Sequence, residues 1–125
     1  MLPREHRLTR ERDFAILFDE GRFIAGNLVN AKVWRVDPEK HPNRGYKSDD
    51  LKIGFVVSAK ISKSAVQRNR VKRQMREVVR LLLKEGGLKS GYHIAILAKE
   101  SMLGQGYEPI QKSVRAVLQK AGILL

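Results

Sequence analysis

One segment, running from about Ser64 to Lys84, constrains the fold more than any other part of the chain. Its apolar residues recur with the period of an α-helix, and at about 100° per residue they fall within a single stripe. The pair Gly86-Gly87 follows and can supply the left-handed backbone geometry that ends many helices. The pattern predicts a long helix packed on a sheet through Val71, Met75, Val78, Val79 and Leu82.

The rest of this helix surface is densely basic, with Glu77 as the one acid between Arg68 and Arg80. Like charges one turn apart cost roughly a few tenths of a kcal/mol per pair, so we expect an anionic partner. Arginine predominates, and its planar guanidinium can hold phosphate oxygens bidentately or stack on a base. Nucleic acid is therefore favoured over a membrane surface, because the small valine-rich stripe is committed to a core. A solvated charged face is the alternative, although such faces normally alternate in sign.

The composition also points to a polyanionic partner. The chain has 125 residues, enough for one domain spanning residues 1–125, and 25 lysines and arginines against 13 acidic residues give a formal charge of +12. The absence of cysteine excludes disulfides and cysteine-ligated metals and fits a reducing compartment. Neither a signal peptide nor a run of about 20 apolar residues is visible, so we expect a cytoplasmic protein.

The remaining segments predict a mixed α/β fold with the order α-β-β-α-β-α. Thr9 is a candidate N-cap for the first helix, and the first two strands should pair as an antiparallel hairpin across a loop at Asp37–Asp50. The third strand is almost continuously apolar, which is typical of a central strand. The expected elements are helix 9–21, strands 28–36 and 51–58, helix 64–84, strand 92–98 and helix 107–120.

The basic helix carries a recognisable motif. Residues 65–77 read Ala-Val-Gln-Arg-Asn-Arg-Val-Lys-Arg-Gln-Met-Arg-Glu, with Arg68-Asn69-Arg70 at the centre. This motif resembles the signature helix of the bacterial ribonuclease P protein component, and the resemblance covers nearly the whole chain, including Asp13-Phe14 and Ile53-Gly54. Two departures stand out. Residues 60–64 lack a glycine often found before the helix, and the Asp37–Asp50 loop is long for the family.

The resemblance implies both a fold and a function. The fold is an α/β (α+β) two-layer sandwich, ribosomal protein S5 domain 2-like, with room for an extra short strand. Its basic helix lies in a left-handed crossover between parallel strands, against a strong general preference for right-handed ones. The implied function is to assist a catalytic RNA that removes the 5′ leader from precursor tRNA, with Mg²⁺ bound mainly by that RNA. We therefore expect ribonuclease P RNA and precursor tRNA as partners, and neither catalytic groups, metal nor an obligate protein partner for the chain itself.

The resemblance also assigns residues to two contacts. A cleft between the first helix and the sheet should hold the single-stranded leader, where aromatic rings stack on bases. Phe14 and Phe18 match this cleft, with plain core packing as the alternative. Lys32 and Trp34 lie on the polar side of strand 28–36 and would extend the cleft, with ordinary partial burial as the alternative for Trp34. The contact with the catalytic RNA is assigned to Lys60, Lys63, Arg68, Asn69, Arg70, Lys72, Arg73, Arg76 and Arg80.

Other classes of function stay open at this point. A small basic ribosomal or ribosome-assembly protein would have a similar size and charge, although it would not need the Arg68–Arg76 motif. A DNA-binding helix would normally come with a helix-turn-helix partner or a zipper repeat, and neither is visible. A protein-only nuclease is disfavoured, because the acidic residues are scattered and His6, His41 and His93 share no metal-ligand spacing.

Overall fold

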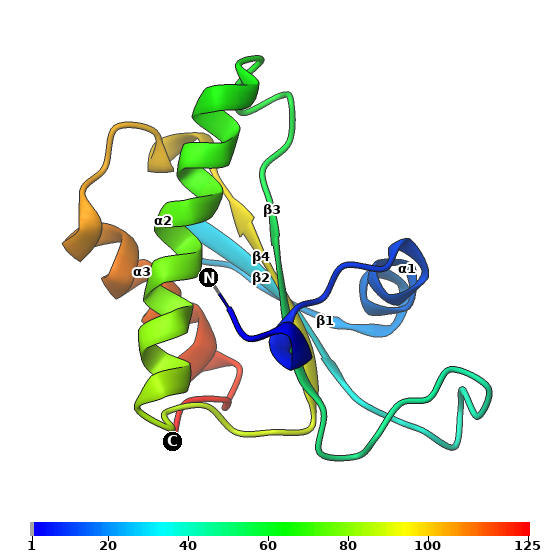
Figure 1. The fold of residues 1–125 in the computed structure, drawn as a ribbon. Coiled ribbons are helices and arrows are strands. Elements are labelled where there is room, and N and C mark those ends of the chain that lie inside the picture. The colour runs from blue at the N-terminus through cyan, green and yellow to red at the C-terminus, as the bar shows by residue number, and fades with distance from the viewer. Residues whose placement is uncertain (1) are drawn as a thin grey trace.

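The computed structural model describes residues 2–125 of the chain (Figure 1). The main helices and strands follow the predicted order, and the extra short strand that the resemblance allowed is present as β1. The elements are η1 (Arg4–His6), α1 (Glu11–Glu20), β1 (Arg22–Ile24), β2 (Val29–Arg35), β3 (Leu51–Val56), α2 (Ala65–Lys84), β4 (Tyr92–Ala98), η2 (Glu100–Met102) and α3 (Tyr107–Lys120).

The strands form one mixed sheet in the order β1-β2-β4-β3. β4 runs antiparallel to β2, with Ile96 opposite Ala31, and parallel to β3, with Ile94 opposite Ile53. The predicted hairpin between strands 28–36 and 51–58 is therefore wrong, since β4 lies between them. The continuously apolar β4 is most stable in the centre, where both of its faces are covered. Its parallel pairing with β3 then requires a long connection, which α2 provides.

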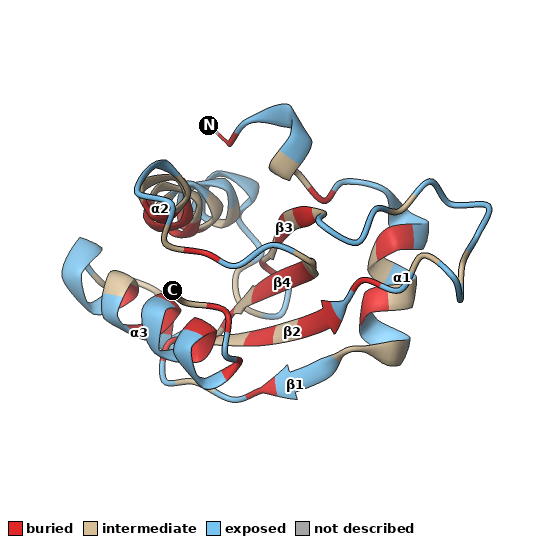
Figure 2. Cartoon of the chain, turned by 90° about the horizontal axis from the view of Figure 1, so that it is seen from below, coloured by how far each residue is buried: buried red, intermediate tan, exposed pale blue. Residues whose placement is uncertain are grey.

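The connection from β3 through α2 to β4 is left-handed. Seen from the α2 side with both strands pointing upward, β4 lies to the left of β3 (Figure 1). Figure 2 shows the resulting layers, with α2 and α3 on one side of the sheet and α1 on the other. Crossovers of this hand are rare, so only the family resemblance pointed to it.

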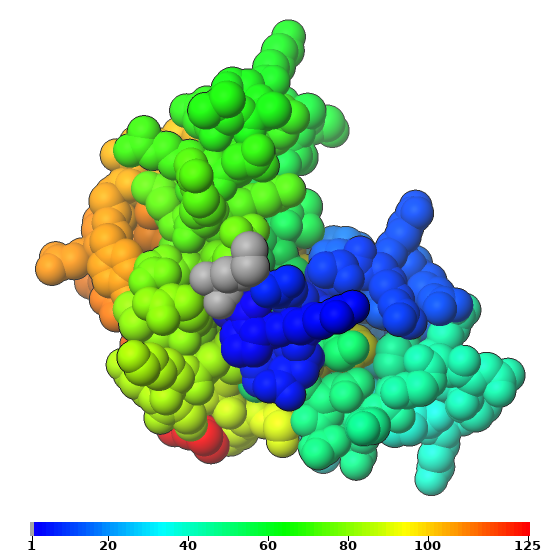
Figure 3. Space-filling view, in the orientation of Figure 1, coloured from blue at the N-terminus to red at the C-terminus, as the bar shows by residue number. Residues whose placement is uncertain are grey.

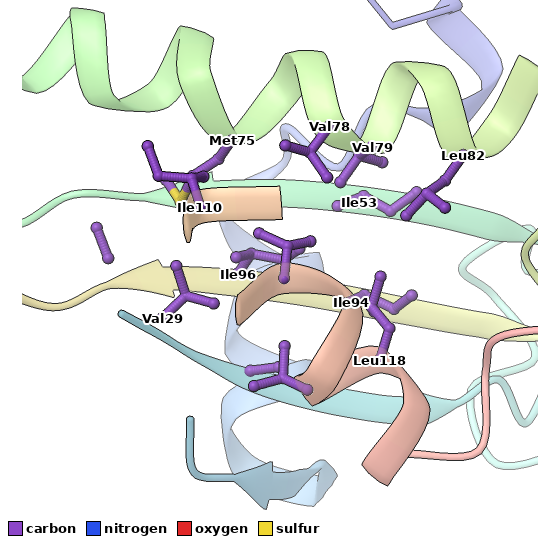
Figure 4. Packing of buried hydrophobic residues seen from close by; sticks show 14 of the residues in the cluster. Val29, Ile53, Met75, Val78, Val79, Leu82, Ile94, Ile96, Ile110 and Leu118 are labelled. Atoms are coloured by element: carbon purple, nitrogen blue, oxygen red, sulfur yellow. The ribbon is translucent and has the colours of Figure 1, made fainter. Parts of the chain in front are cut away.

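The main core lies between the sheet and the two helices α2 and α3 (Figure 4). The apolar stripe predicted for α2 is buried throughout, and it meets Ile53 and Ile94 of the sheet together with Ile110 and Leu118 of α3. Burying one such side chain contributes about 1.5–3 kcal/mol. The stripe therefore fixes the rotation of α2 about its axis and leaves the basic residues on the outward side.

The ends of α2 are capped as its sequence suggests, whereas α1 begins differently from the prediction. Ser64 Oγ accepts a hydrogen bond from the backbone N of Gln67 at 3.2 Å, and Gly86 has a φ of +69°. The predicted N-cap on Thr9 is wrong, because α1 starts after Arg10 and has no side-chain cap. The chain before α1 is held instead by the edge of β3, where Leu8 N donates to Ile53 O at 3.1 Å.

The side of the sheet that carries α1 has a second, smaller apolar cluster. Leu17 of α1 and Trp34 of β2 are both buried in it. Phe14 rests on β3 at Gly54, where an added Cβ would lie 2.3 Å from the phenyl ring. Gly54 therefore allows α1 to approach the sheet closely. The helix covers only part of this face, because Asn30, Lys32, Val56 and Leu97 stay half-buried.

Candidate nucleic-acid interface

The outward side of α2 and the loop before it form an exposed basic surface. Asn69, Arg70 and Arg73 are exposed on the helix, and Lys60 and Lys63 are exposed just before it. Within the described residues 2–125, these four cations take part in no ion pair. Their charges are thus available to an external anion, and α2 holds those on the helix at fixed spacing.

Two of the predicted RNA-binding arginines already have partners inside the protein. Arg68 Nη1 donates to Ser62 O at 2.8 Å, which fastens the glycine-free turn before α2. Arg80 and Glu77 form a two-pronged pair, with Nη2 to Oε1 at 2.7 Å and Nε to Oε2 at 3.0 Å. These hydrogen bonds lower the pKa of the Glu77 carboxyl and raise the pKa of Arg80. Arg80 therefore attracts phosphate less strongly than Arg73 does.

Lys72 and Arg76, one turn apart on α2, line a groove between this helix and the N-terminal segment. The groove has a volume of about 400 Å³, and Gly54 and Phe55 of β3 and Phe14 of α1 also line it. In the space-filling view of this face, α2 and α1 lie on either side of the N-terminal segment (Figure 3). Arg7 of the N-terminal segment also lines it. The groove thus combines three cations with aromatic rings, the two kinds of group that contact a single-stranded nucleic acid.

Phe14 and Phe18 lie one turn apart on α1 and are stacked, with ring centroids 6.3 Å apart and an interplanar angle of 20°. Phe14 is half-buried, in partial agreement with the core-packing alternative, whereas Phe18 is 41% exposed. A ring as exposed as that of Phe18 contributes little to the core and is accessible to a base. Both residues therefore remain candidates for stacking, and Phe18 is the stronger one.

Phe23 is an aromatic residue that the sequence analysis missed. It is 57% exposed and lies opposite Lys32 in the β1–β2 pair. Directly opposed residues of an antiparallel pair project from the same face, so Phe23 joins Lys32 on the side of the sheet that carries α1. The three residues of β1 are too few to show an alternating pattern. Only the pairing with β2 reveals where this ring lies.

Trp34 does not extend the exposed aromatic surface. Its side chain is 5% exposed, and the rings of His41, Tyr46 and His93 pack edge-to-face on it at centroid distances of 5.5–5.7 Å. Alternation did place Trp34 on the α1 side of the sheet, as predicted. Of the two alternatives for Trp34, the structure supports burial, and the ring is buried more fully than expected because the long 37–50 loop folds back over it.

Neither a metal cluster nor a membrane helix is found among residues 2–125. No three His, Cys, Asp or Glu side chains gather closely enough to hold a metal ion, and no helix is long and apolar enough to cross a membrane. His6 and His41 have different polar partners: His6 Nδ1 lies 2.6 Å from Leu51 O, and His41 Nε2 lies 2.9 Å from Glu20 Oε2. What this surface offers chemically is positive charge and aromatic area.

Sequence comparison identifies close relatives over the full length. A family profile described as Ribonuclease P matches residues 2–122. A ribonuclease P protein component from Synechococcus sp. is 34% identical over 125 residues, which is 100% of this chain and 88% of that protein. Another from Pseudanabaena sp. is 35% identical over 124 residues, covering 99% of this chain and 97% of that protein. The relatives thus match the chain from end to end.

Solved structures share the fold. The RNase P protein of Staphylococcus aureus superposes with a TM-score of 0.76 at 22% identity, covering 96% of this chain and 98% of that one. The RNase P protein of Thermotoga maritima gives a TM-score of 0.72 at 22% identity, with 92% and 96% covered. At this identity the superpositions concern the fold, and the family rests on the profile and on the relatives above 30% identity. From these matches, the chain belongs to the ribonuclease P protein family.

Proposed function

We propose that the chain acts as the protein subunit of ribonuclease P, binding the catalytic RNA through α2 and the 5′ leader of precursor tRNA beside α1. One observation carries the proposal: the cations Lys72 and Arg76 line the same groove as the ring of Phe14. Phe18 lies one turn further along α1 and continues the aromatic wall. An RNA strand in this groove would have cations that bind its phosphates on one side and aromatic rings that stack on its bases on the other.

The contact with the catalytic RNA is assigned to the exposed side of α2 and the loop before it. Arg70 and Arg73 are exposed and form no ion pair within residues 2–125, so they can hold phosphates. Asn69, which precedes Arg70 and is also exposed, can both donate and accept a hydrogen bond. Lys60 and Lys63 extend the charge beyond the N-terminal end of the helix. Neutralising phosphates releases condensed counterions, which would make this contact the main source of affinity.

The contact with the leader is assigned to the groove and to the open part of the sheet face. Stacking of a base on an aromatic ring contributes about 1–3 kcal/mol and tolerates any sequence, because every base has a π-face. This tolerance suits a protein that must accept the leaders of many different tRNAs. Lys32, half-buried opposite the exposed Phe23, would then meet the backbone of the same strand.

The hydrolysis itself is assigned to the RNA. Water attacks the phosphodiester before the first tRNA nucleotide, which leaves a 5′-phosphate on the tRNA and a 3′-hydroxyl on the leader. The described residues contain no acidic or histidine cluster that fits a metal ion, so the protein is not proposed to hold the Mg²⁺ of the reaction. Its part is to bind and orient the leader and to reduce charge repulsion between the two RNAs.

The proposal is tested by leader cleavage at low Mg²⁺ with the cognate catalytic RNA and a precursor tRNA, with and without the protein. We expect the protein to stimulate cleavage, and no cleavage by the protein without the RNA. Arg73→Ala should lower the stimulation, whereas Arg115→Ala, an exposed arginine of α3, serves as the matched control. A folded protein that fails to stimulate its cognate RNA would overturn the proposal and would favour ribosome assembly instead.

A further inference from the structure

The segment Asp37–Asp50, hereafter the clasp segment, lies next to α1 on the side of the sheet opposite to α2 (Figure 1). It contacts α1 at both ends of the helix. In the first turn, Tyr46 Oη donates to Asp13 Oδ1 at 2.6 Å. At the last residue, Glu20 Oε2 lies 2.9 Å from His41 Nε2, and Glu20 Oε1 lies 3.1 Å from Lys40 Nζ. Three polar contacts, one at the first turn and two at the last residue, therefore restrain how far α1 can tilt or slide.

The clasp segment is itself anchored to the sheet by aromatic packing. The ring of Tyr46 lies edge-to-face with Trp34 of β2 at 5.5 Å and with His93 of β4 at 5.1 Å. The ring of His41 packs on Trp34 in the same way at 5.7 Å. Such aromatic pairs contribute more than their buried area alone. The segment thus links α1 to the two central strands through rings that the RNA contacts described above do not use.

The contact between Tyr46 and Asp13 is well suited to a lasting restraint. Asp13 is 7% exposed. If the tyrosine hydroxyl were removed, bulk water could not replace it as a hydrogen-bond donor to the Asp13 carboxylate. Burial and the adjacent Asp13 carboxylate raise the pKa of Tyr46 well above its ordinary value, so the hydroxyl keeps its proton and donates. The next residue after Asp13 is Phe14, whose ring lies on the groove side at Gly54. A restraint on Asp13 is therefore also a restraint on Phe14.

The helix that is restrained needs this support. α1 has only 10 residues and no side-chain N-cap, and helices of this length are marginal on their own. Its packing on the sheet relies mainly on Leu17 and on the Phe14 ring at Gly54. Phe18 is 41% exposed and adds little to that packing, although it is the ring offered most openly to a base.

We propose that the clasp segment positions α1 as the wall of the leader groove, with Tyr46 and His41 as positioning residues that hold the Phe14 and Phe18 rings at a fixed distance from the sheet. The inference rests on the proposed function in one respect, that the occupant of the groove is a single-stranded leader. The restraint on α1 itself is independent of any RNA. The free energy of leader binding is then not reduced by the entropic cost of ordering α1.

The first experiment measures the clasp without RNA. Trp34 is the one tryptophan of the chain and lies inside the contact, so its fluorescence reports on the clasp directly. Tyr46→Phe removes a single hydroxyl and should increase acrylamide quenching of Trp34 and speed hydrogen exchange of the α1 amides. Tyr107→Phe, at an exposed tyrosine of α3, is the matched control and should change neither reading. Unchanged quenching and exchange in Tyr46→Phe would overturn the restraint.

The second experiment measures the ratio of affinities for a precursor tRNA with a 5′ leader and for the same tRNA without one. This ratio isolates the leader groove from the α2 contact. We expect Tyr46→Phe to lower it roughly threefold to tenfold, which is less than the full contribution of a hydrogen bond to a charged group, because α1 keeps its other contacts. Binding to the catalytic RNA should be unchanged. His41→Ala should lower the ratio too, and His41→Gln, which can still donate to Glu20, should restore most of it.

The two experiments separate the possible failures. If the unmodified protein shows no leader-dependent affinity, the proposed function is wrong, whereas the quenching and exchange data still decide whether the clasp restrains α1. If the unmodified protein prefers the leader and Tyr46→Phe leaves the ratio within twofold, the positioning role is wrong. If Tyr46→Phe does not fold, His41→Ala against His41→Gln gives the same decision, because the His41 side chain is 20% exposed and its replacement leaves the Tyr46–Asp13 hydrogen bond in place.

Discussion

The two surfaces proposed to contact RNA are built in different ways. α2 has 20 residues and presses a continuous apolar stripe into the main core. α1 has 10 residues, lies over a smaller cluster and depends on the clasp segment at both of its ends. The charged contact is thus fixed by the period of one helix, whereas the aromatic contact depends on residues far apart in the chain.

This difference sets what each surface can tolerate. On α2, an exposed cation can be replaced without disturbing its neighbours, because the buried stripe holds the helix. On α1, a change in the 37–50 loop is expected to reach the Phe14 and Phe18 rings without touching either one. Regions with few buried apolar contacts open more easily than the global core, so α1 should open before α2 does.

The largest expected effect tests the anchoring of α2. Met75 is fully buried in the middle of the stripe, and Met75→Ala should lower the free energy of unfolding by about 2–5 kcal/mol, since it leaves a cavity. Urea denaturation measures this change. Val66→Ala is the control on the same helix, because Val66 is 78% exposed and should cost no more than about 0.5 kcal/mol. Equal destabilisation by both would contradict the claim that the stripe holds α2.

The next effect concerns the aromatic contact alone. Phe18→Ala should weaken binding of a precursor tRNA by about 1–3 kcal/mol, because it removes the stacking surface. Because Phe18 is 41% exposed, the free energy of unfolding should change far less than it does for Met75→Ala. Fluorescence anisotropy with leader-bearing and leaderless tRNA measures the difference. Similar weakening for the leaderless tRNA would place the contact of Phe18 outside the leader groove.

Features of α2 could be predicted from the sequence because they depend on local patterns, whereas the order of the strands could not. The stripe of α2, its outward charge and its C-terminal end follow from local period and from the Gly86-Gly87 pair, and the structure agrees with them. The predicted hairpin between strands 28–36 and 51–58 is wrong, because local alternation does not show that β4 lies between β2 and β3. The handedness of the crossover likewise came from the family resemblance and not from physical rules.

The residues of the α1 face were harder to predict, because their exposure depends on distant segments. Alternation put Trp34 on the correct face of β2 but could not show that the 37–50 loop covers it. Phe23 was overlooked since β1 is defined only by its pairing with β2. On α2, the pairing of Arg80 with Glu77 was open to prediction, because the two residues are one turn apart on a helix.

The basic surface of α2 contains arginines with and without an acidic partner, and these should contribute differently to RNA binding. Arg73→Ala should reduce the slope of log K against log salt for catalytic-RNA binding by about one unit, the change expected when a single phosphate is no longer neutralised. Arg80→Ala should reduce the slope less, because Glu77 already balances that charge. Filter binding over a range of KCl concentrations gives both slopes. Equal slopes for the two variants would mean that Glu77 releases Arg80 to the RNA.

The smallest expected effect is a pH dependence confined to the α1 side of the sheet. Burial lowers the pKa of His93 below its ordinary value of 6.5, although Asp50 at 3.5 Å and the more distant Asp13 act in the opposite direction and Lys52 adds to the lowering. Neither ring nitrogen of His93 makes a hydrogen bond of good geometry among the described residues, and the Asp50 carboxylate at 3.5 Å offsets only part of the desolvation of a charged ring. The folded protein therefore favours the neutral ring.

The sign of the effect follows from proton binding. Between the ordinary pKa of 6.5 and the lower pKa in the folded protein, the unfolded chain binds more protons, so stability falls as the pH is lowered through this window. The slope from one such group cannot exceed about 1.4 kcal/mol per pH unit. His93→Phe should flatten the slope measured by urea denaturation between pH 7.5 and pH 5.5, whatever its effect on absolute stability.

Because His93 packs beneath Tyr46 and not beneath α2, acid should also weaken leader binding before it weakens binding of the catalytic RNA. Parallel weakening of both would mean that the two surfaces share one cooperative unit.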